Sequence, residues 1–300
     1  MVRKLFLILL TTFGMSTNLD FPNISNEIPG DVNQDGIVNI LDIIITVNFI
    51  FEGEFIEIAD LNEDSIVNVV DIIEIVQIII YGWTPEFPQN ILFIGNSYTY
   101  FNGGIHNHLS SMVIERFPDF HTNYNAITAG GATLQSHYSN TNTISTIEEG
   151  NWDYVILQEQ STRPVDNPQL FYDFAELMDE VITDSSAEAM FFMTWAREYN
   201  PDMIEDLANS YNTIGEQLEA DVCPVGRAWE LALELNPEIE LYTNDQSHPN
   251  AKGTYLAVCM FYICLFGENP QGIEFTNDDS ISNEERLFLQ NVAWQLMNNY

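Results

Sequence analysis

From residue 91 to the end of the chain, short apolar runs alternate with longer stretches in which apolar residues recur every three or four positions. The short runs predict buried strands, and the periodic stretches predict amphipathic helices. Strands are expected at 91–95, 124–128, 154–158, 189–195 and 221–225. Helices are expected at 170–182, 203–218 and 227–235, followed by one that Asn250 caps and that runs to about residue 265. This alternation predicts an α/β domain with a parallel sheet that helices cover on both faces.

The chain before residue 83 has a different pattern, a twelve-residue motif that occurs at 31–42 and again at 60–71. Oxygen-bearing side chains stand at positions one, three, five, nine and twelve, and the apolar residue at position seven offers its backbone carbonyl. This is the ligand spacing of an EF-hand calcium loop. The expected ligands are Asp31, Asn33, Asp35, Ile37, Asn39 and Asp42 in one loop and Asp60, Asn62, Asp64, Ile66, Asn68 and Asp71 in the other. The motif predicts two structural Ca2+ sites, and the alternative is a pair of solvated acidic turns.

Both loops depart from the usual EF-hand loop. Position twelve is aspartate rather than glutamate, and Ser65 stands where the first loop has Gly36. Because position six makes a sharp turn, the second loop is expected to be strained or to bind calcium more weakly. Whether calcium fills the second loop stays open.

Helices rich in isoleucine and valine are expected after the loops, at 40–51 and 69–81, and no helix enters either loop. A duplicated loop-helix unit with aspartate at position twelve resembles a dockerin, over residues 30–82. The resemblance implies a small all-α, EF-hand-like domain whose partner is a cohesin-like scaffold domain. Loop positions ten and eleven help dockerins to select a cohesin, and here they are apolar pairs, 40–41 and 69–70, instead of hydroxyl pairs. The cohesin partner therefore stays open, and these residues could also pack within the chain.

The ends of these modules suggest the domain organisation. Residues 1–16 combine a basic start, an apolar run and small residues before a cleavage point, which is typical of a secretory signal peptide. Residues 17–29 are expected to form an N-terminal linker, and 83–90, with two prolines, a second linker. We therefore expect a secreted, extracellular protein without a membrane span, because charged residues interrupt the later isoleucine-rich runs.

Composition narrows the possible partners. Eight Lys and Arg against 45 Asp and Glu give a net charge of −37, which argues against binding to nucleic acid or anionic membranes. The three cysteines, Cys223, Cys259 and Cys264, lack metal-ligand spacing and are expected to be buried thiols, with a bridge from Cys223 to either of the others left open.

Candidate chemistry stands at the end of the first strand and near the C-terminus. Ser97 follows an apolar run of strand length, so its hydroxyl is expected at the carboxyl edge of the sheet. Asp245 and His248 are three residues apart, a spacing that lets the carboxylate orient one imidazole nitrogen while the other faces Ser97. A nucleophile, a base and an orienting carboxylate together favour acyl transfer.

Four blocks of residues 91–300 resemble the SGNH (GDSL-like) hydrolases. They are Gly95-Asn96-Ser97, Gly130-Gly131-Ala132-Thr133, the segment after the third strand, and Asp245-Gln246-Ser247-His248. The resemblance implies a flavodoxin-like three-layer αβα fold in which Ser97, Asp245 and His248 form the triad. It also implies an oxyanion hole built from the backbone N–H groups of Ser97 and Gly131 and from one side-chain amide.

The third block departs from the family pattern, which has Gly-x-Asn-Asp where this chain has Gln158-Glu159-Gln160-Ser161. Gln160 falls where the asparagine amide would donate to the oxyanion, and Gln158 is the competing choice. Arg163 and Arg197 are expected at the same sheet edge, where they could bind a sugar or a carboxylate or form salt bridges with the abundant acids.

These observations predict a secreted serine esterase that hydrolyses carboxylic esters, acetyl esters of polysaccharides in particular, and that needs no cofactor for catalysis. A lipase-like or thioesterase activity on the same triad is the first alternative. The second is a non-catalytic carbohydrate-binding or assembly protein. The acyl group, the alcohol and the oligomeric state stay open at this stage.

Overall fold

The computed structural model describes residues 28–300 except 54, 63, 82–86 and 119. The predicted signal peptide, nearly all of the N-terminal linker and residues 83–86 of the second linker lie outside the described residues.

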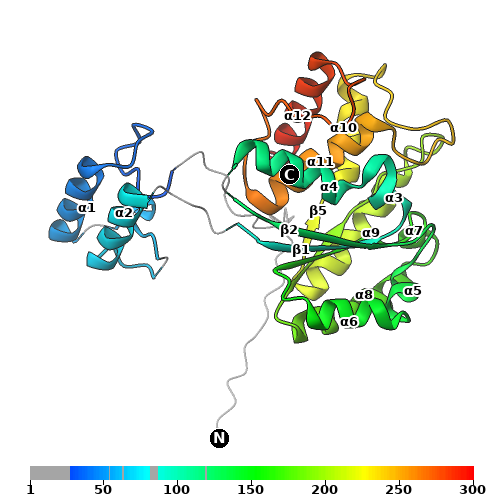
Figure 1. The fold of residues 1–300 in the computed structure, drawn as a ribbon, viewed down its shortest axis with the longest axis horizontal. Helices are drawn as coiled ribbons and strands as arrows, with labels where there is room; N and C mark the ends of the chain where they lie inside the picture. The colour runs from blue at the N-terminus through cyan, green and yellow to red at the C-terminus, as the bar shows by residue number, and fades with distance from the viewer. Residues whose placement is uncertain (1–27, 54, 63, 82–86, 119) are drawn as a thin grey trace, which may run out of the picture.

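Two helices of 13 residues form the first module, α1 at Ile40–Glu52 and α2 at Val69–Tyr81, with the 3₁₀ turn η1 at Glu57–Ala59 between them (Figure 1). Both helices begin where the sequence predicts. Asn39 caps α1 and forms a capping box with Asp42, so loop positions nine and twelve also start the helix. The small core of the module contains Val32, Ala59 and Ile75.

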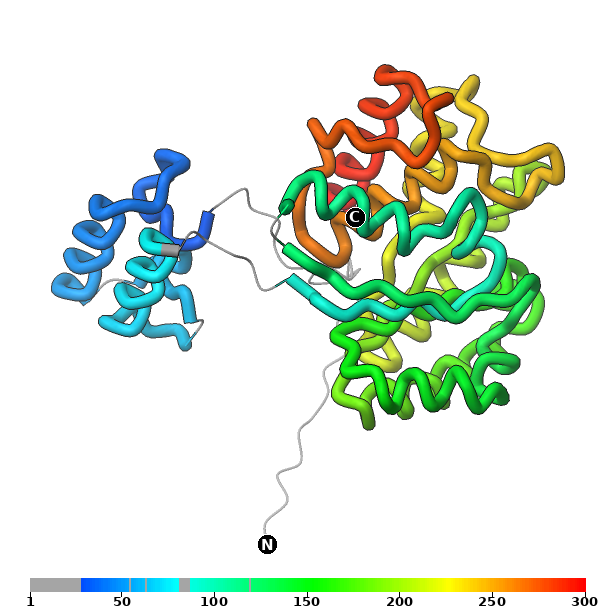
Figure 2. The backbone as a smooth tube through the Cα atoms, viewed as in Figure 1, coloured from blue at the N-terminus to red at the C-terminus, as the bar shows by residue number. Residues whose placement is uncertain are grey.

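Five parallel strands form the sheet of the second module, in the order β2-β1-β3-β4-β5. Strands β1 and β2 run side by side in the ribbon and in the backbone tube (Figures 1 and 2). They are β1 Asn90–Gly95, β2 Asn123–Thr128, β3 Tyr154–Leu157, β4 Glu188–Phe192 and β5 Asp221–Cys223. All five predicted strands are confirmed, although β4 stops before residue 195 because its neighbours β3 and β5 end at the same level. This strand order is that of flavodoxin-like folds, whose ligands bind where β1 and β3 meet.

Helices cover both faces of the sheet, as predicted. One face packs against α4 Ile105–Arg116, α10 Val225–Leu235, α11 Ala251–Phe266 and α12 Asn283–Met297. The other packs against α5 Leu134–Tyr138, α6 Thr141–Glu149, α8 Pro168–Asp184 and α9 Met203–Leu218. The short helices α3 Ser97–Tyr100, η2 Phe101–Gly103 and α7 Arg163–Asp166 follow the carboxyl ends of β1 and β3.

Helix α11 is buried on nearly every side, because α4, α10 and α12 all pack on it. Asn250 caps it as predicted, by accepting a hydrogen bond from the Gly253 N–H, and this cap fixes the residue two positions after His248. Cys223 and Cys259 are buried free thiols, and the partly buried Cys264 is also free. In the part of the chain that the structure describes, every helix is too short or too polar to cross a membrane.

Candidate active site

The turn after β1 presents Ser97 at the first position of α3. Asn96 has extended backbone angles and caps this short helix, since its side-chain oxygen accepts the Tyr98 N–H at 3.1 Å. The Asn96 amide also donates to the Ala132 carbonyl at 3.0 Å, which joins this turn to the loop after β2. Gly95 is required here, because a Cβ atom would stand only 2.6 Å from the Gln158 side-chain oxygen. Ser97 is thus held by a turn that three segments build together.

The loop before α11 carries the other two triad candidates. His248 Nε2 lies 2.8 Å from Ser97 Oγ, and His248 Nδ1 lies 2.5 Å from Asp245 Oδ2. The other carboxylate oxygen of Asp245 accepts the backbone N–H groups of Ser247 and His248 and the hydroxyl of Thr243. Desolvation alone would raise the pKa of Asp245, but the hydrogen bonds from His248, Thr243 and Ser247 outweigh it and hold that pKa well below its usual range. The structure therefore brings all three predicted residues into one hydrogen-bonded line.

Aromatic rings support this line in a way that the sequence analysis did not identify. Phe101 stacks on the His248 imidazole, with ring centroids 4.5 Å apart and planes 18° apart. Tyr98 lies edge-on to the same imidazole and stacks on Trp195 on its other side. The sequence signal was present, because Phe101 is four residues after Ser97 and so returns to the nucleophile at the end of one helical turn.

Gly131 lies at the predicted second block and lines the same pocket as Ser97. Its φ of 67° is in the left-handed region, which glycine enters without steric cost. Among the described residues, neither the Gly131 N–H nor the Ser97 N–H has a hydrogen-bond acceptor. Two residues that line the cavity therefore have backbone N–H groups without an acceptor, and an oxyanion hole is built from such donors.

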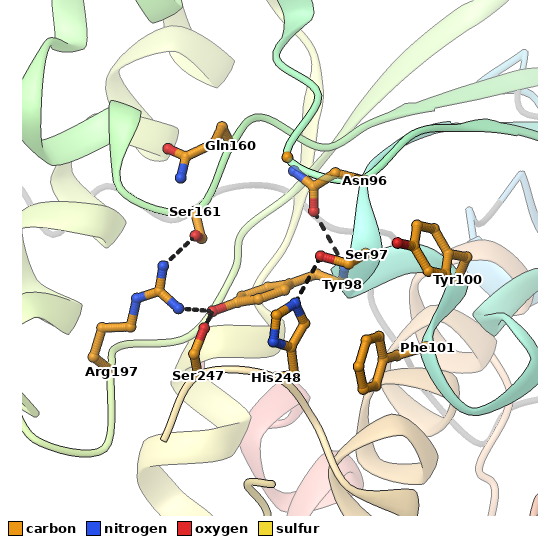
Figure 3. Close-up of a pocket in the computed structure, with 12 residues that line it drawn as sticks. Asn96, Ser97, Tyr98, Tyr100, Phe101, Gln160, Ser161, Arg197, Ser247 and His248 are labelled. Carbon is orange, nitrogen blue, oxygen red and sulfur yellow. Dashed lines mark hydrogen bonds between the residues drawn. The ribbon is translucent and has the colours of Figure 1, made fainter. Parts of the chain in front are cut away.

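The two glutamines after β3 have different environments. Gln158 is fully buried, and its side-chain oxygen accepts the Asn96 N–H at 2.8 Å and the Thr99 hydroxyl at 3.0 Å. Gln160 instead lines the pocket, and its oxygen accepts the N–H groups of Thr162 and Arg163, both at 3.0 Å. Because that oxygen is engaged, the Gln160 Nε2 is the part of the amide that can donate to a ligand. Of the two glutamines, Gln160 lines the cavity and Gln158 does not (Figure 3).

Glu159, between these glutamines, is a buried carboxyl group that the sequence analysis did not single out. Its side chain accepts the Gln160 N–H at 2.5 Å and the Leu134 N–H at 3.3 Å. It therefore joins the third block to the start of α5, directly after the loop that carries Gly131. Burial raises the pKa of Glu159 to about 7, although the hydrogen bond from Gln160 and the nearby Arg163 act in the opposite direction.

A cavity of about 420 Å³ opens at Ser97. This volume falls within the range of small-molecule sites, roughly 300–1,000 Å³. Figure 3 shows Tyr100 and Phe101 on one side of Ser97 and His248, and Gln160, Ser161 and Arg197 on the other. The residues that line the cavity are Asn96, Ser97, Tyr98, Tyr100, Phe101, Gly130, Gly131, Gln160, Ser161, Arg197, Ser247 and His248.

Of the two arginines that the sequence places at this edge, only Arg197 lines the cavity. Arg163 contacts the Gln135 side chain at 3.4 Å instead.

The two predicted calcium loops share most of their internal hydrogen bonds, although the Asp35 N–H donates to Asp31 and no corresponding bond to Asp60 is seen in the described residues. Asp31 accepts the Gly36 N–H at 2.7 Å, and Asp60 accepts the Ser65 N–H at 2.8 Å. The carboxylates at position twelve accept backbone N–H groups within their own loops. Within the described residues, no three His, Cys, Asp or Glu side chains are grouped as a metal site.

The donor set of these loops nevertheless suits calcium, which prefers carboxylate, amide and backbone carbonyl oxygens. One oxygen of Asp60 is buried and has no hydrogen-bond partner in the described structure, so a cation would satisfy it. Ser65 adopts a φ of 66° and Gly36 a φ of 86°, so the serine takes up the backbone conformation that the glycine has in the first loop.

Comparison with known proteins supports both resemblances. Residues 29–80 match the family described as Dockerin type I domain, so the predicted resemblance of the first module is confirmed. None of the curated proteins matches the chain significantly.

Several solved structures share the fold of the second module. A protein from Slackia heliotrinireducens named as a candidate SGNH hydrolase is 22% identical with a TM-score of 0.51, over 58% of this chain and 97% of its own. A DUF4886 family protein from Bacteroides uniformis is 16% identical with a TM-score of 0.54, over 70% of this chain and 95% of its own. The acetyl xylan esterase AlAXEase is 14% identical with a TM-score of 0.50, over 59% of this chain and 100% of its own. The predicted three-layer SGNH hydrolase fold is confirmed.

Proposed function

We propose that this protein is a secreted serine esterase that hydrolyses carboxylic esters, acetyl esters of polysaccharides in particular. The observation that carries the proposal is the hydrogen-bonded line from Ser97 through His248 to Asp245 at the mouth of a cavity. The hydroxyl, the imidazole and the carboxylate have the order and spacing that nucleophilic catalysis needs.

The reaction follows from this geometry. His248 Nε2 removes the Ser97 proton while Oγ attacks the ester carbonyl carbon, and Asp245 stabilises the imidazolium that forms. The N–H groups of Ser97 and Gly131 and the Gln160 amide donate to the oxyanion. The tetrahedral intermediate collapses, and the alcohol leaves with the proton from His248. Water, activated by the same imidazole, then hydrolyses the acyl-enzyme.

The acetyl preference has two supports. The cavity is lined largely by polar groups at its Gln160 end, which suits a sugar better than a long acyl chain. The fold is shared with an acetyl xylan esterase, although at 14% identity this likeness is an argument by analogy.

We further propose that calcium folds the first module and that this module tethers the enzyme to a cohesin-like scaffold domain. Exposed apolar side chains at loop positions ten and eleven, on Ile40, Leu41, Val69 and Val70, form the surface proposed for the partner.

A panel of aryl esters of increasing acyl length tests the activity, together with labelling by a serine-directed phosphonate. We expect acetate to turn over fastest and the label to lie on Ser97. Faster turnover of long acyl chains would replace the acetyl esterase with a lipase-like or thioesterase activity. A chain that neither turns over esters nor takes the label would be a carbohydrate-binding or assembly protein.

A further inference from the structure

The polar end of the cavity contains a guanidinium group that the reaction above does not use. Arg197 Nη1 donates to the Tyr98 hydroxyl at 2.8 Å, and Nη2 donates to the Ser161 hydroxyl at 2.7 Å. The hydroxyl groups of Tyr98 and Ser161 are both neutral at the pH values at which most enzymes work, and burial raises the pKa of Tyr98 further. Figure 3 shows the guanidinium facing the side of the cavity where Ser161 and Ser247 lie.

Arg197 forms no salt bridge in the described structure. Within those residues, no carboxylate oxygen lies within 4.0 Å of its nitrogen atoms. Among the described residues, Arg227 forms salt bridges with Glu205 and Glu230, and Lys252 forms one with Glu285, whereas Arg116, Arg163 and Arg286, like Arg197, form none. What distinguishes Arg197 from these other arginines is that it lines the cavity at Ser97.

The groups around Arg197 can all donate to an anion. A guanidinium group has five N–H donors, and two of them are used by the hydroxyls of Tyr98 and Ser161. The hydroxyls of Ser161 and Ser247 and the Gln160 amide line the same end of the cavity, which contains no carboxylate of its own. The planar fork of donors on arginine matches a carboxylate, which accepts two parallel hydrogen bonds.

On these grounds, and resting on the esterase function, we propose that Arg197 binds a carboxylate of the substrate, so that the preferred ester is acidic. The carboxylate could belong to the alcohol, as in an acetylated uronic acid, or to the acyl group, as in the monoester of a dicarboxylic acid. Both place an anion beside the scissile ester.

Two matched substrate pairs test the proposal and separate the two sources. The first pair is an acetylated methyl glucuronoside and the same acetate of methyl glucoside. The second pair is a hemisuccinate and a butyrate of one neutral alcohol. We expect kcat/KM to be about 10- to 100-fold higher for the acidic member of one pair, which is the usual range for a hydrogen bond to a charged group. The pair that shows the difference identifies the source.

The variant Arg197→Gln should abolish most of this preference, mainly through a higher KM for the acidic ester, so that kcat/KM falls much more for the acidic ester than for the neutral one. Arg197→Lys, which keeps the charge but not the fork, should lie between the two. Arg116→Gln removes the same charge from an exposed position on α4 and should leave the preference intact. Assays at about 0.15 M salt limit the long-range repulsion from the net charge, since the Debye length is then about 8 Å.

Two results would overturn the proposal. Equal kcat/KM values for both members of each pair would show that the enzyme does not recognise a substrate carboxylate. An equal loss of kcat/KM on acidic and neutral esters in Arg197→Gln would show that Arg197 is a positioning residue for Tyr98. Both results leave the esterase function intact. Failure of that function is seen separately, as the absence of phosphonate labelling at Ser97.

Discussion

Ser97 Oγ and His248 Nε2 lie 2.8 Å apart, although 151 residues separate them in the chain. The contact between His248 and Asp245 is local, since those residues are three apart. The orientation of the imidazole is therefore set within one loop, whereas its meeting with the nucleophile depends on how α11 packs on the sheet.

Replacing Ser97 with alanine should lower ester turnover by roughly 10³-fold or more, because it removes the nucleophile and leaves the oxyanion donors in place. The fold should persist, since the Ser97 hydroxyl makes no other hydrogen bond among the described residues. Hydrolysis of an aryl acetate, with circular dichroism as the control for folding, checks this. Comparable activity in the folded variant would mean that the triad is wrong.

The variant Glu159→Gln should change how stability depends on pH. Burial raises the pKa of Glu159 from 4.5 to about 7, so the folded protein holds a proton that the unfolded chain releases between these values. The contribution of Glu159 to stability is therefore fully present below pH 4.5 and is lost as the pH rises to about 7. The loss amounts to about 3 kcal/mol, at 1.36 kcal/mol for each unit of pKa.

Glutamine cannot ionise, so the variant should gain about 3 kcal/mol relative to the wild type between pH 4.5 and pH 8. Denaturant unfolding of both proteins at the two pH values, in the same calcium concentration, measures this difference. Stability curves that stay parallel would show that the Glu159 carboxyl keeps an ordinary pKa in the folded protein.

The sequence predicts the sheet well because each strand is a short apolar run beside a turn or a helix, as in 91–95 and 154–158. The hydrogen-bonded line from Ser97 through His248 to Asp245 was also predictable, since Ser97 follows a strand directly and Asp245 and His248 are neighbours on one turn. These features depend on local spacing, which is visible in a single chain.

Other parts of the site depend on contacts between distant segments. Gln158 and Gln160 are equivalent in the sequence, and what separates them is the hydrogen bond from the Asn96 N–H to Gln158, across 62 residues. The burial of Glu159 and the contact between Arg197 and Tyr98, 99 residues apart, have the same origin. Periodic patterns in the sequence do not predict such contacts between distant segments. The roles of these residues can therefore be assigned only from the folded structure.

The variant Ser65→Gly should tighten calcium binding by the second loop. Ser65 has a φ of 66°, and a residue with a Cβ atom pays about 1 kcal/mol or more in this left-handed conformation. Because calcium binding and folding are expected to be coupled in such loops, removing the strain should lower the half-saturating calcium concentration of that loop about fivefold. Helix formation in a fragment covering residues 30–82, followed by circular dichroism during a calcium titration, measures it.

Gly36→Ser is the matched control, since it puts the same strain into the first loop, where a Cβ atom would contact nothing within 4 Å. It should weaken calcium binding by a similar factor. A fragment that is fully helical in chelator would contradict the coupling between calcium and folding, and equal titrations for Ser65→Gly and the wild type would contradict the strain.

The last prediction concerns the third donor of the oxyanion hole. Gln160→Ala should lower kcat by roughly 10²-fold, because a donor to the oxyanion acts mainly in the transition state. Gln160→Glu is the sharper variant, since it keeps an oxygen for the Thr162 and Arg163 N–H groups but replaces the amide donor with an acceptor. It should lower kcat at least as much, while the Thr162 and Arg163 N–H groups keep their acceptor.

Gln158→Ala should instead cost about 2 kcal/mol of stability, because it leaves the buried Asn96 N–H without its acceptor. Steady-state kinetics and denaturant unfolding on the three variants separate these effects. A large fall in kcat for Gln158→Ala at unchanged stability, with Gln160→Glu nearly normal, would assign the donor to Gln158. Normal kcat in all three would leave the hole with backbone donors alone.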